Sequence, residues 1–133
     1  MHVLTQIGLV ALGSCAGGLL RWGVAVGFGR LFATTFPWAT FFINLSGSLF
    51  LGWFLTVVGR FVPSEQSWFS QDGLKLMVAV GFTGAYTTFS TFEFESHTLL
   101  SDGDYLKGIT YIMGSLFLGL VAVRLGMKLA GAE

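Results

Sequence analysis

The stretch GFTGAYTTFSTF, residues 81–92, lies inside a long apolar segment and yet is a poor sequence for a continuous helix. Two glycines, Gly81 and Gly84, precede a run rich in hydroxyl side chains, with Phe89 and Phe92 placed among them. Glycine lowers helix propensity by about 1 kcal/mol relative to alanine, and β-branched threonine adds to this deficit. We therefore expect a helix break. In lipid, unwound backbone is tolerated only where it is buried in protein or lines a polar path, so the break predicts a conduction or binding site.

The surrounding sequence has the composition of a membrane protein. Of its 133 residues, 53% are hydrophobic and 11% are charged, whereas about 25% of residues are charged in soluble domains. A helix needs about 20 apolar residues to cross a bilayer. The sequence thus predicts an all-α membrane protein: one transmembrane domain, residues 1–133, with four spans at about 4–29, 38–59, 73–98 and 105–129 and a break in the third.

The basic residues divide almost evenly between the two membrane faces that these spans define. The face that holds both termini has Arg60, Lys75, Arg124 and Lys128, and the opposite face has Arg21, Arg30 and Lys107. Cytoplasmic loops normally carry an excess of lysine and arginine. The near balance predicts a chain with little orientation preference, which inserts both ways and pairs head to tail.

Small residues recur along the first span. The pairs Gly13/Gly17 and Gly23/Gly27 have the spacing that lets two membrane helices approach closely. Both pairs predict helix packing.

Two spans carry a polar stripe at helical spacing. Thr40, Asn44 and Ser48 share one face of the second span, and the fourth span repeats the spacing with Tyr111, Ser115 and Gly119. Asn44 is the most informative of them, because a carboxamide in hydrocarbon needs hydrogen-bond partners. An interhelical hydrogen bond and a place in the lining of a pore are both open to it.

Charged residues within the spans are few. Arg21 interrupts the first span, where it either caps backbone carbonyls or attracts anions. Near the end of the third span, Glu93 and His97 stand four residues apart, a spacing compatible with a metal pair, but a third ligand is missing. We expect these residues to mark the point where the helix leaves the hydrocarbon.

A path lined by hydroxyls, one carboxamide and phenyl edges suits a small anion. Hydroxyl and amide donors replace the anion's hydration, while a phenyl ring presents a positive edge. Without fixed charge, such a path binds an ion weakly enough to release it. Carbonyls freed by the break suit a hard cation such as Na⁺. The alternative is a Phe-rich helix whose threonines bond back to their own carbonyls, which leaves the matching stripes unexplained.

Three segments carry a resemblance to a known family. GFTGAYTTFSTFEFE at residues 81–95, FFINLSGSLFLG at residues 41–52 and GGLLRW at residues 17–22 resemble the small dual-topology fluoride channels of bacteria, the Fluc or CrcB family. The resemblance covers nearly the whole chain. It implies an antiparallel homodimer of four-helix subunits in the inner membrane, with two fluoride pores and a central structural Na⁺ where the broken third helices cross.

The resemblance also implies roles for individual residues. Those similar to the family's fluoride pore and polar track are Asn44, Phe89, Ser90, Thr91, Phe92, Tyr111 and Ser115. The carbonyls of Gly84 and Thr87 resemble the Na⁺ ligands, with residues 84–87 supplying the unwound backbone. Glu95 resembles the acidic residue near the far end of the track, and Arg21 the first-helix arginine. Gly119 departs from relatives that carry a hydroxyl there.

The implied activity is passive export of fluoride, with no enzymatic step. One alternative is a small proton-coupled multidrug exporter, which needs a carboxylate deep in the membrane; the first span offers Arg21 and no carboxylate. Another is a membrane subunit that transports nothing and packs against a larger partner. An intramembrane hydrolase lacks a Ser, His and Asp set within the spans.

Overall fold

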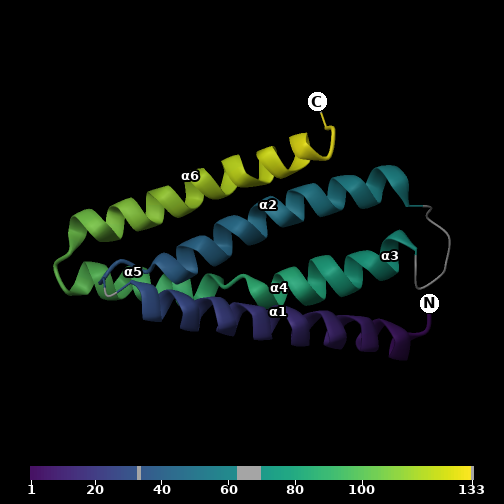
Figure 1. Cartoon of the computed structure of the whole chain (residues 1–133), viewed down its shortest axis with the longest axis horizontal. Helices are drawn as coiled ribbons and strands as arrows, with labels where there is room; N and C mark the ends of the chain where they lie inside the picture. Colours follow the sequence, from purple (N-terminus) through teal and green to yellow (C-terminus); the bar gives the residue numbers. More distant parts are fainter. Residues whose placement is uncertain (33, 63–69, 133) are drawn as a thin grey trace.

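The computed structural model describes residues 1–32, 34–62 and 70–132. All regular secondary structure within these residues is helical. The elements are α1 (Val3–Leu31), α2 (Trp38–Phe61), α3 (Gln71–Leu74), the π-helix η1 (Lys75–Thr83), α4 (Gly84–Tyr86), α5 (Phe89–Ser101) and α6 (Tyr105–Leu129), as Figure 1 shows. The helices α1, α2 and α6 coincide with the predicted ranges 4–29, 38–59 and 105–129 to within two residues at each end. The predicted third span corresponds to the series α3–η1–α4–α5.

Three of these helices, α1, α2 and α6, are long and apolar enough to cross a membrane, judged by length and composition. The third segment is interrupted between α4 and α5 because its backbone is extended at Thr87 (φ −77°, ψ 160°) and Thr88 (φ −148°, ψ 111°). The predicted break is therefore present. Its predicted extent is wrong in part, because Gly84–Tyr86 is helical and the unwound residues are Thr87 and Thr88.

Gly81, before the break, serves close packing rather than unwinding. A Cβ at Gly81 would lie 2.7 Å from the carbonyl oxygen of Val10 in α1. From the other side, a Cβ at Gly13 would overlap the carbonyl oxygen of Met77, and one at Gly17 would overlap that of Phe82. The packing predicted for Gly13 and Gly17 is thus confirmed within the subunit, where it holds α1 against η1.

The second glycine pair of α1 has no such neighbour. A Cβ at Gly23 or Gly27 would meet nothing within 4 Å among the described residues of the subunit. On the other side of the molecule, α2 and α6 approach closely where Gly52 faces the carbonyl of Val123 and Gly126 faces that of Leu49.

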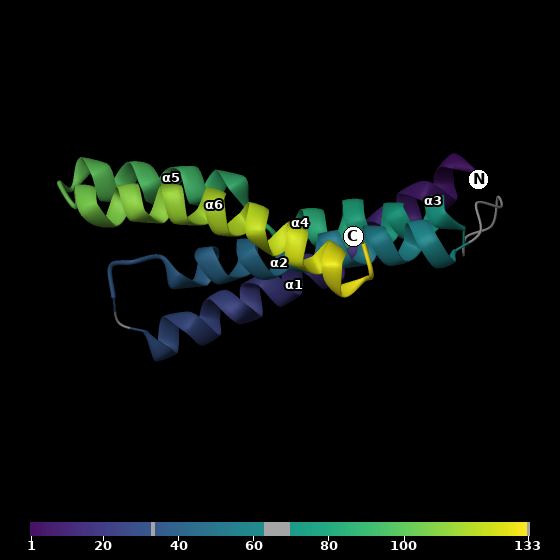
Figure 2. The ribbon, with the colours of Figure 1, turned by 90° about the horizontal axis from the view of Figure 1, so that it is seen from above.

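A tight turn reverses the chain between α5 and α6, which run side by side in Figure 2. Gly103 adopts φ 82°, a left-handed conformation that costs glycine little. The Gly103 N–H donates to the carbonyl of Leu100, and the Asp104 N–H donates to that of Leu99, which closes the end of α5. The hairpin places Phe92, Leu99 and Tyr111 in one buried cluster.

Candidate functional site at the helix break

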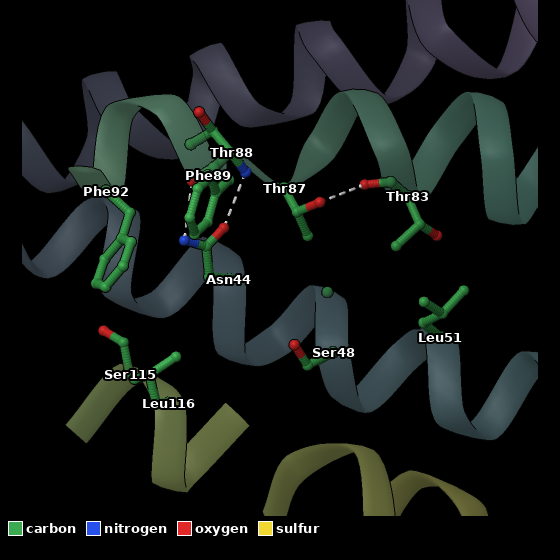
Figure 3. Close-up of a pocket in the computed structure, with 11 residues that line it drawn as sticks. Asn44, Ser48, Leu51, Thr83, Thr87, Thr88, Phe89, Phe92, Ser115 and Leu116 are labelled. Atoms are coloured by element: carbon green, nitrogen blue, oxygen red, sulfur yellow. Dashed lines mark hydrogen bonds between the residues drawn. The ribbon is translucent and has the colours of Figure 1, made fainter. Parts of the chain in front are cut away.

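The side chain of Asn44 holds the unwound backbone of the third segment. Its Oδ1 accepts a hydrogen bond from the Thr88 N–H at 2.9 Å, and its Nδ2 donates to the Thr88 carbonyl at 3.1 Å (Figure 3). In a continuous helix, the Thr88 N–H would bond to the carbonyl of Gly84, four residues earlier. Asn44 therefore supplies the interhelical hydrogen bonds that one of its two predicted roles requires.

Threonine hydroxyls close the two helix ends that meet at the break. Before it, Thr87 Oγ1 donates to the carbonyl of Thr83 at 2.9 Å. After it, the Thr88 hydroxyl caps α5 by accepting from the Thr91 N–H at 3.3 Å, and donates to Thr91 Oγ1 at 2.8 Å. Thr88 is not among the residues that the sequence assigned to the site, although an extended threonine followed by a helix is a recognisable N-cap.

A tyrosine adds a further tie between α2 and the break. Ser46 Oγ lies 2.9 Å from the Tyr86 hydroxyl and donates to the carbonyl of Phe42 at 2.7 Å. Because serine has one proton to donate, the Tyr86 hydroxyl is the donor of the first bond. Tyr86 ends α4 directly before the unwound residues, so this bond fixes where the break begins.

Arg21 reaches the break from α1. Its Nη1 lies 3.5 Å from the carbonyl oxygen of Thr87. The contact is at the long end of hydrogen-bonding distance, and it matches the carbonyl-capping role predicted for Arg21. It also places positive charge beside Thr87, which lines the cavity described next.

A cavity of about 310 Å³ lies between the break, α2 and α6. Its wall combines neutral polar groups with aromatic and aliphatic carbon, and consists of Asn44, Gly47, Ser48, Leu51, Thr83, Thr87, Thr88, Phe89, Phe92, Ser115 and Leu116. Figure 3 shows Asn44 and Ser48 on α2, Phe89 and Phe92 on α5, and Ser115 on α6 around this space. Asn44 and Ser48 from the first predicted polar stripe thus meet Ser115 from the second beside the helix break.

The two phenylalanines of the cavity differ in their surroundings. Their ring centroids are 5.9 Å apart, with planes inclined by 42°. Phe92 is 6% exposed and packs on Tyr111, with 5.2 Å between ring centroids, whereas Phe89 is 71% exposed on the subunit. Phe92 is therefore part of the core as well as of the cavity wall, and Phe89 is a surface side chain of the single subunit.

Glu95 joins α2, α5 and α6 on the far side of Phe92. Thr40 Oγ1 donates to its Oε1 at 2.9 Å, and the fully buried Tyr111 donates to its Oε2 at 2.8 Å. Glu95 also lines a second cavity of about 420 Å³, together with residues 34–37 and the α5–α6 turn. The sequence placed Tyr111 and Glu95 on the track, but their shared contact with Thr40 depends on the tertiary structure.

The remaining predicted residues lie around this framework. Ser115 lines the first cavity, while Ser90, Thr91 and Gly84 are exposed on the subunit surface. Glu93 and His97 are also exposed. No group of three or more His, Cys, Asp or Glu side chains suited to a metal occurs among the described residues.

Comparison with known proteins gives the chain a family. The family described as CrcB-like protein, Camphor Resistance (CrcB), matches residues 8–127. The chain belongs to the CrcB family. Membership agrees with the three apolar helices, and the chain is a multi-pass protein of the bacterial inner membrane.

Curated CrcB relatives match over most of their length. A protein of Chloroflexus aurantiacus is 40% identical over 127 residues, covering 95% of each chain. One of Thermus thermophilus is 40% identical over 93% of this chain and 92% of its own. One of Paramagnetospirillum magneticum is 43% identical over 89% of each. All three are named fluoride-specific ion channel FluC.

Proposed function

We propose that this CrcB protein is a fluoride channel that allows passive export of fluoride from the cytoplasm and catalyses no reaction. The observation that carries the proposal is the cavity at the helix break, whose polar side chains are uncharged and lie beside Phe89 and Phe92. Relatives about 40% identical over nearly the whole chain are named fluoride-specific ion channels. The whole chain serves as one transmembrane domain in this function.

The orientation of Asn44 suits an anion. Its amide cannot be flipped, because Oδ1 must face the Thr88 N–H and Nδ2 the Thr88 carbonyl. The carboxamide nitrogen has two N–H groups and spends one of them on that carbonyl. The second N–H is therefore the donor that Asn44 offers to an ion in the cavity, while its oxygen, which would repel an anion, is already occupied.

The cavity wall and the exposed face of Phe89 support assembly with a second copy. A phenyl ring that is 71% exposed and lines the cavity at the break becomes a pore wall when another subunit covers it. The near-even division of basic residues between the two faces agrees with antiparallel pairing. In this homodimer the Gly23/Gly27 face of α1, unused within the subunit, is available for packing.

Backbone carbonyls at the break suit a structural Na⁺ between the two copies. The Gly84 carbonyl loses its regular helical donor when the Thr88 N–H turns to Asn44. The Thr87 carbonyl is also near Arg21, whose positive charge repels a cation. Na⁺ and the Arg21 guanidinium would therefore share this carbonyl. One subunit offers two such carbonyls, fewer than a hard cation takes, and a second copy would supply the others. Na⁺ bound there would hold the two breaks together.

The second candidate is a proton-coupled exporter. The observation in its favour is Glu95, a carboxylate held between three helices by Thr40 and Tyr111. Such an exporter exchanges protons for its substrate, so transport depends on a proton gradient. A channel moves fluoride down its own gradient without one.

Ion efflux from liposomes that contain only this protein separates these functions. A channel releases fluoride rapidly, retains chloride and needs no proton gradient. Fluoride release that stops when the proton gradient is collapsed would identify the exporter instead. Liposomes that retain fluoride both with and without a proton gradient would refute the proposal. The protein would then be a membrane subunit that transports nothing.

A further inference from the structure

Ser96 has a buried hydroxyl without a hydrogen bond. The residue is 5% exposed, and among the described residues the buried side-chain oxygens that lack a partner are Ser96 Oγ and Ser115 Oγ. Buried polar groups in native proteins nearly always have a partner, so each exception requires an explanation. Ser115 lines the cavity at the break, which accounts for its hydroxyl. Ser96 has no role in the site described so far.

Three helical hydroxyls elsewhere in the described residues bond to the backbone of their own helix. Ser46, Thr56 and Thr98 each donate to the carbonyl four residues earlier, at 2.7, 2.8 and 2.9 Å. The same bond is open to any serine or threonine inside a helix. Ser96 and Ser115 do not make it, so their protons remain available to another acceptor.

Ser96 faces the seam between α5 and α6. Phe92 and Leu99, four residues before and three after it, share its helical face and belong to the buried cluster around Tyr111. A Cβ at Gly108 of α6 would lie 3.5 Å from Leu99 Cβ. Because the two helices are antiparallel (Figure 2), Ser96 lies about one turn further along this seam, near the level of Tyr111.

This position lies between the two cavities. The cavity at the break reaches Phe92 on α5 and Ser115 on α6. The second cavity reaches Glu95 and Leu99 on α5. An ion that passes along the seam between α5 and α6 crosses the section between Phe92 and Leu99, where Tyr111 and Glu95 are already bonded to each other. The unspent donor in this section is the hydroxyl of Ser96.

We propose that Ser96 is a further fluoride-binding residue, whose hydroxyl donates to the ion as it crosses from the cavity at the break to the Glu95 cavity. The inference rests on the proposed channel function and adds a residue to it. A passing anion is an acceptor that the serine lacks at rest. The hydrogen bond to fluoride then lowers the energy of the ion in this section, and this explains why an unpaired hydroxyl is buried there.

The variant Ser96→Ala separates this role from packing. Removing a hydroxyl that has no partner leaves a methyl group in the same buried seam, so the midpoint of thermal unfolding in detergent should stay the same or rise. Fluoride efflux from liposomes should fall by about tenfold, as expected for loss of a hydrogen bond to a charged group. Ser101→Ala is the matched control on α5, because Ser101 is exposed and its hydroxyl already has His97 Nε2 as a partner; its efflux should equal that of the wild type.

Two results would overturn the assignment while leaving the channel intact. One is wild-type efflux in Ser96→Ala. The other is a lower rate accompanied by a lower unfolding midpoint, which would assign Ser96 to packing. If the wild-type protein itself releases no fluoride, the proposed function fails and this inference fails with it.

Discussion

Asn44 and Thr88 are joined by two hydrogen bonds, one from the backbone N–H to the carboxamide oxygen and one from the carboxamide nitrogen to the backbone carbonyl. A side chain on α2 thereby pairs with extended backbone as a neighbouring strand would. The pairing satisfies both polar groups of Thr88 at a depth where lipid offers no substitute. One residue thus satisfies the unwound backbone and also lines the cavity.

Asn44→Ala should destabilise the folded subunit. Both backbone groups of Thr88 would lose their partners, and an unpaired buried group costs about 1–3 kcal/mol. We expect a loss of about 2–6 kcal/mol, measured by chemical denaturation in detergent. The control is Ser48→Ala, which removes a hydroxyl from the same face of α2 and the same cavity. Equal stability of both variants would contradict the bracing role of Asn44.

Substitutions of Phe89 and Phe92 should affect fluoride efflux alike but subunit stability differently. Replacing either by Ile should slow fluoride efflux from liposomes, because the aromatic edge is lost from the cavity wall. Phe92→Ala should also destabilise the fold by about 3–5 kcal/mol, as for other buried phenylalanines. Phe89, 71% exposed on the subunit, should tolerate alanine with little change in subunit stability. Unchanged efflux in both Ile variants would remove the rings from the mechanism.

Gly13→Ala should prevent α1 from packing on η1. The added methyl group would overlap the carbonyl oxygen of Met77, which is backbone and cannot rotate away. We expect a lower unfolding midpoint and poor recovery of folded protein by size-exclusion chromatography. Gly8→Ala is the control on the same helix, since its Cβ would meet nothing within 4 Å. A folded, wild-type-like Gly13→Ala variant would show that this close approach is unnecessary.

Tyr111→Phe should test the bridge at Glu95. The ring and its packing on Phe92 remain, while the donor to Glu95 Oε2 is lost. We expect stability to fall by about 1.5–3 kcal/mol, the range for hydrogen bonds to charged groups, and fluoride efflux to slow. Thr40→Val removes the other donor to the same carboxylate with little change of shape. Wild-type efflux in both variants would show that conduction does not need the hydrogen bonds to Glu95.

The sequence was sufficient for the helices and for the existence of the break, but it misplaced the unwound residues. Glycine and threonine propensities predicted a break within residues 81–92, and the family resemblance implied unwound backbone at residues 84–87, whereas Gly84–Tyr86 is helical and Thr87–Thr88 is extended. Propensity is a local preference, and tertiary contacts override it. Here Gly81 is packed against α1, and Asn44 and Tyr86 tie the following residues to α2.

Composition, length and residue spacing determined that the chain is a helical membrane protein with polar faces on its second and fourth spans, because burial in lipid selects apolar residues and helical periodicity fixes which residues share a face. They did not reveal that Asn44 is spent on Thr88, that Thr40 and Tyr111 converge on Glu95, or that the hydroxyl of Ser96 lacks a partner. Each of these depends on the distance between side chains on different helices. That distance depends on how closely the helix backbones approach one another. Glycine contacts between helices control this approach. The spacing of residues along a single helix carries no information about it.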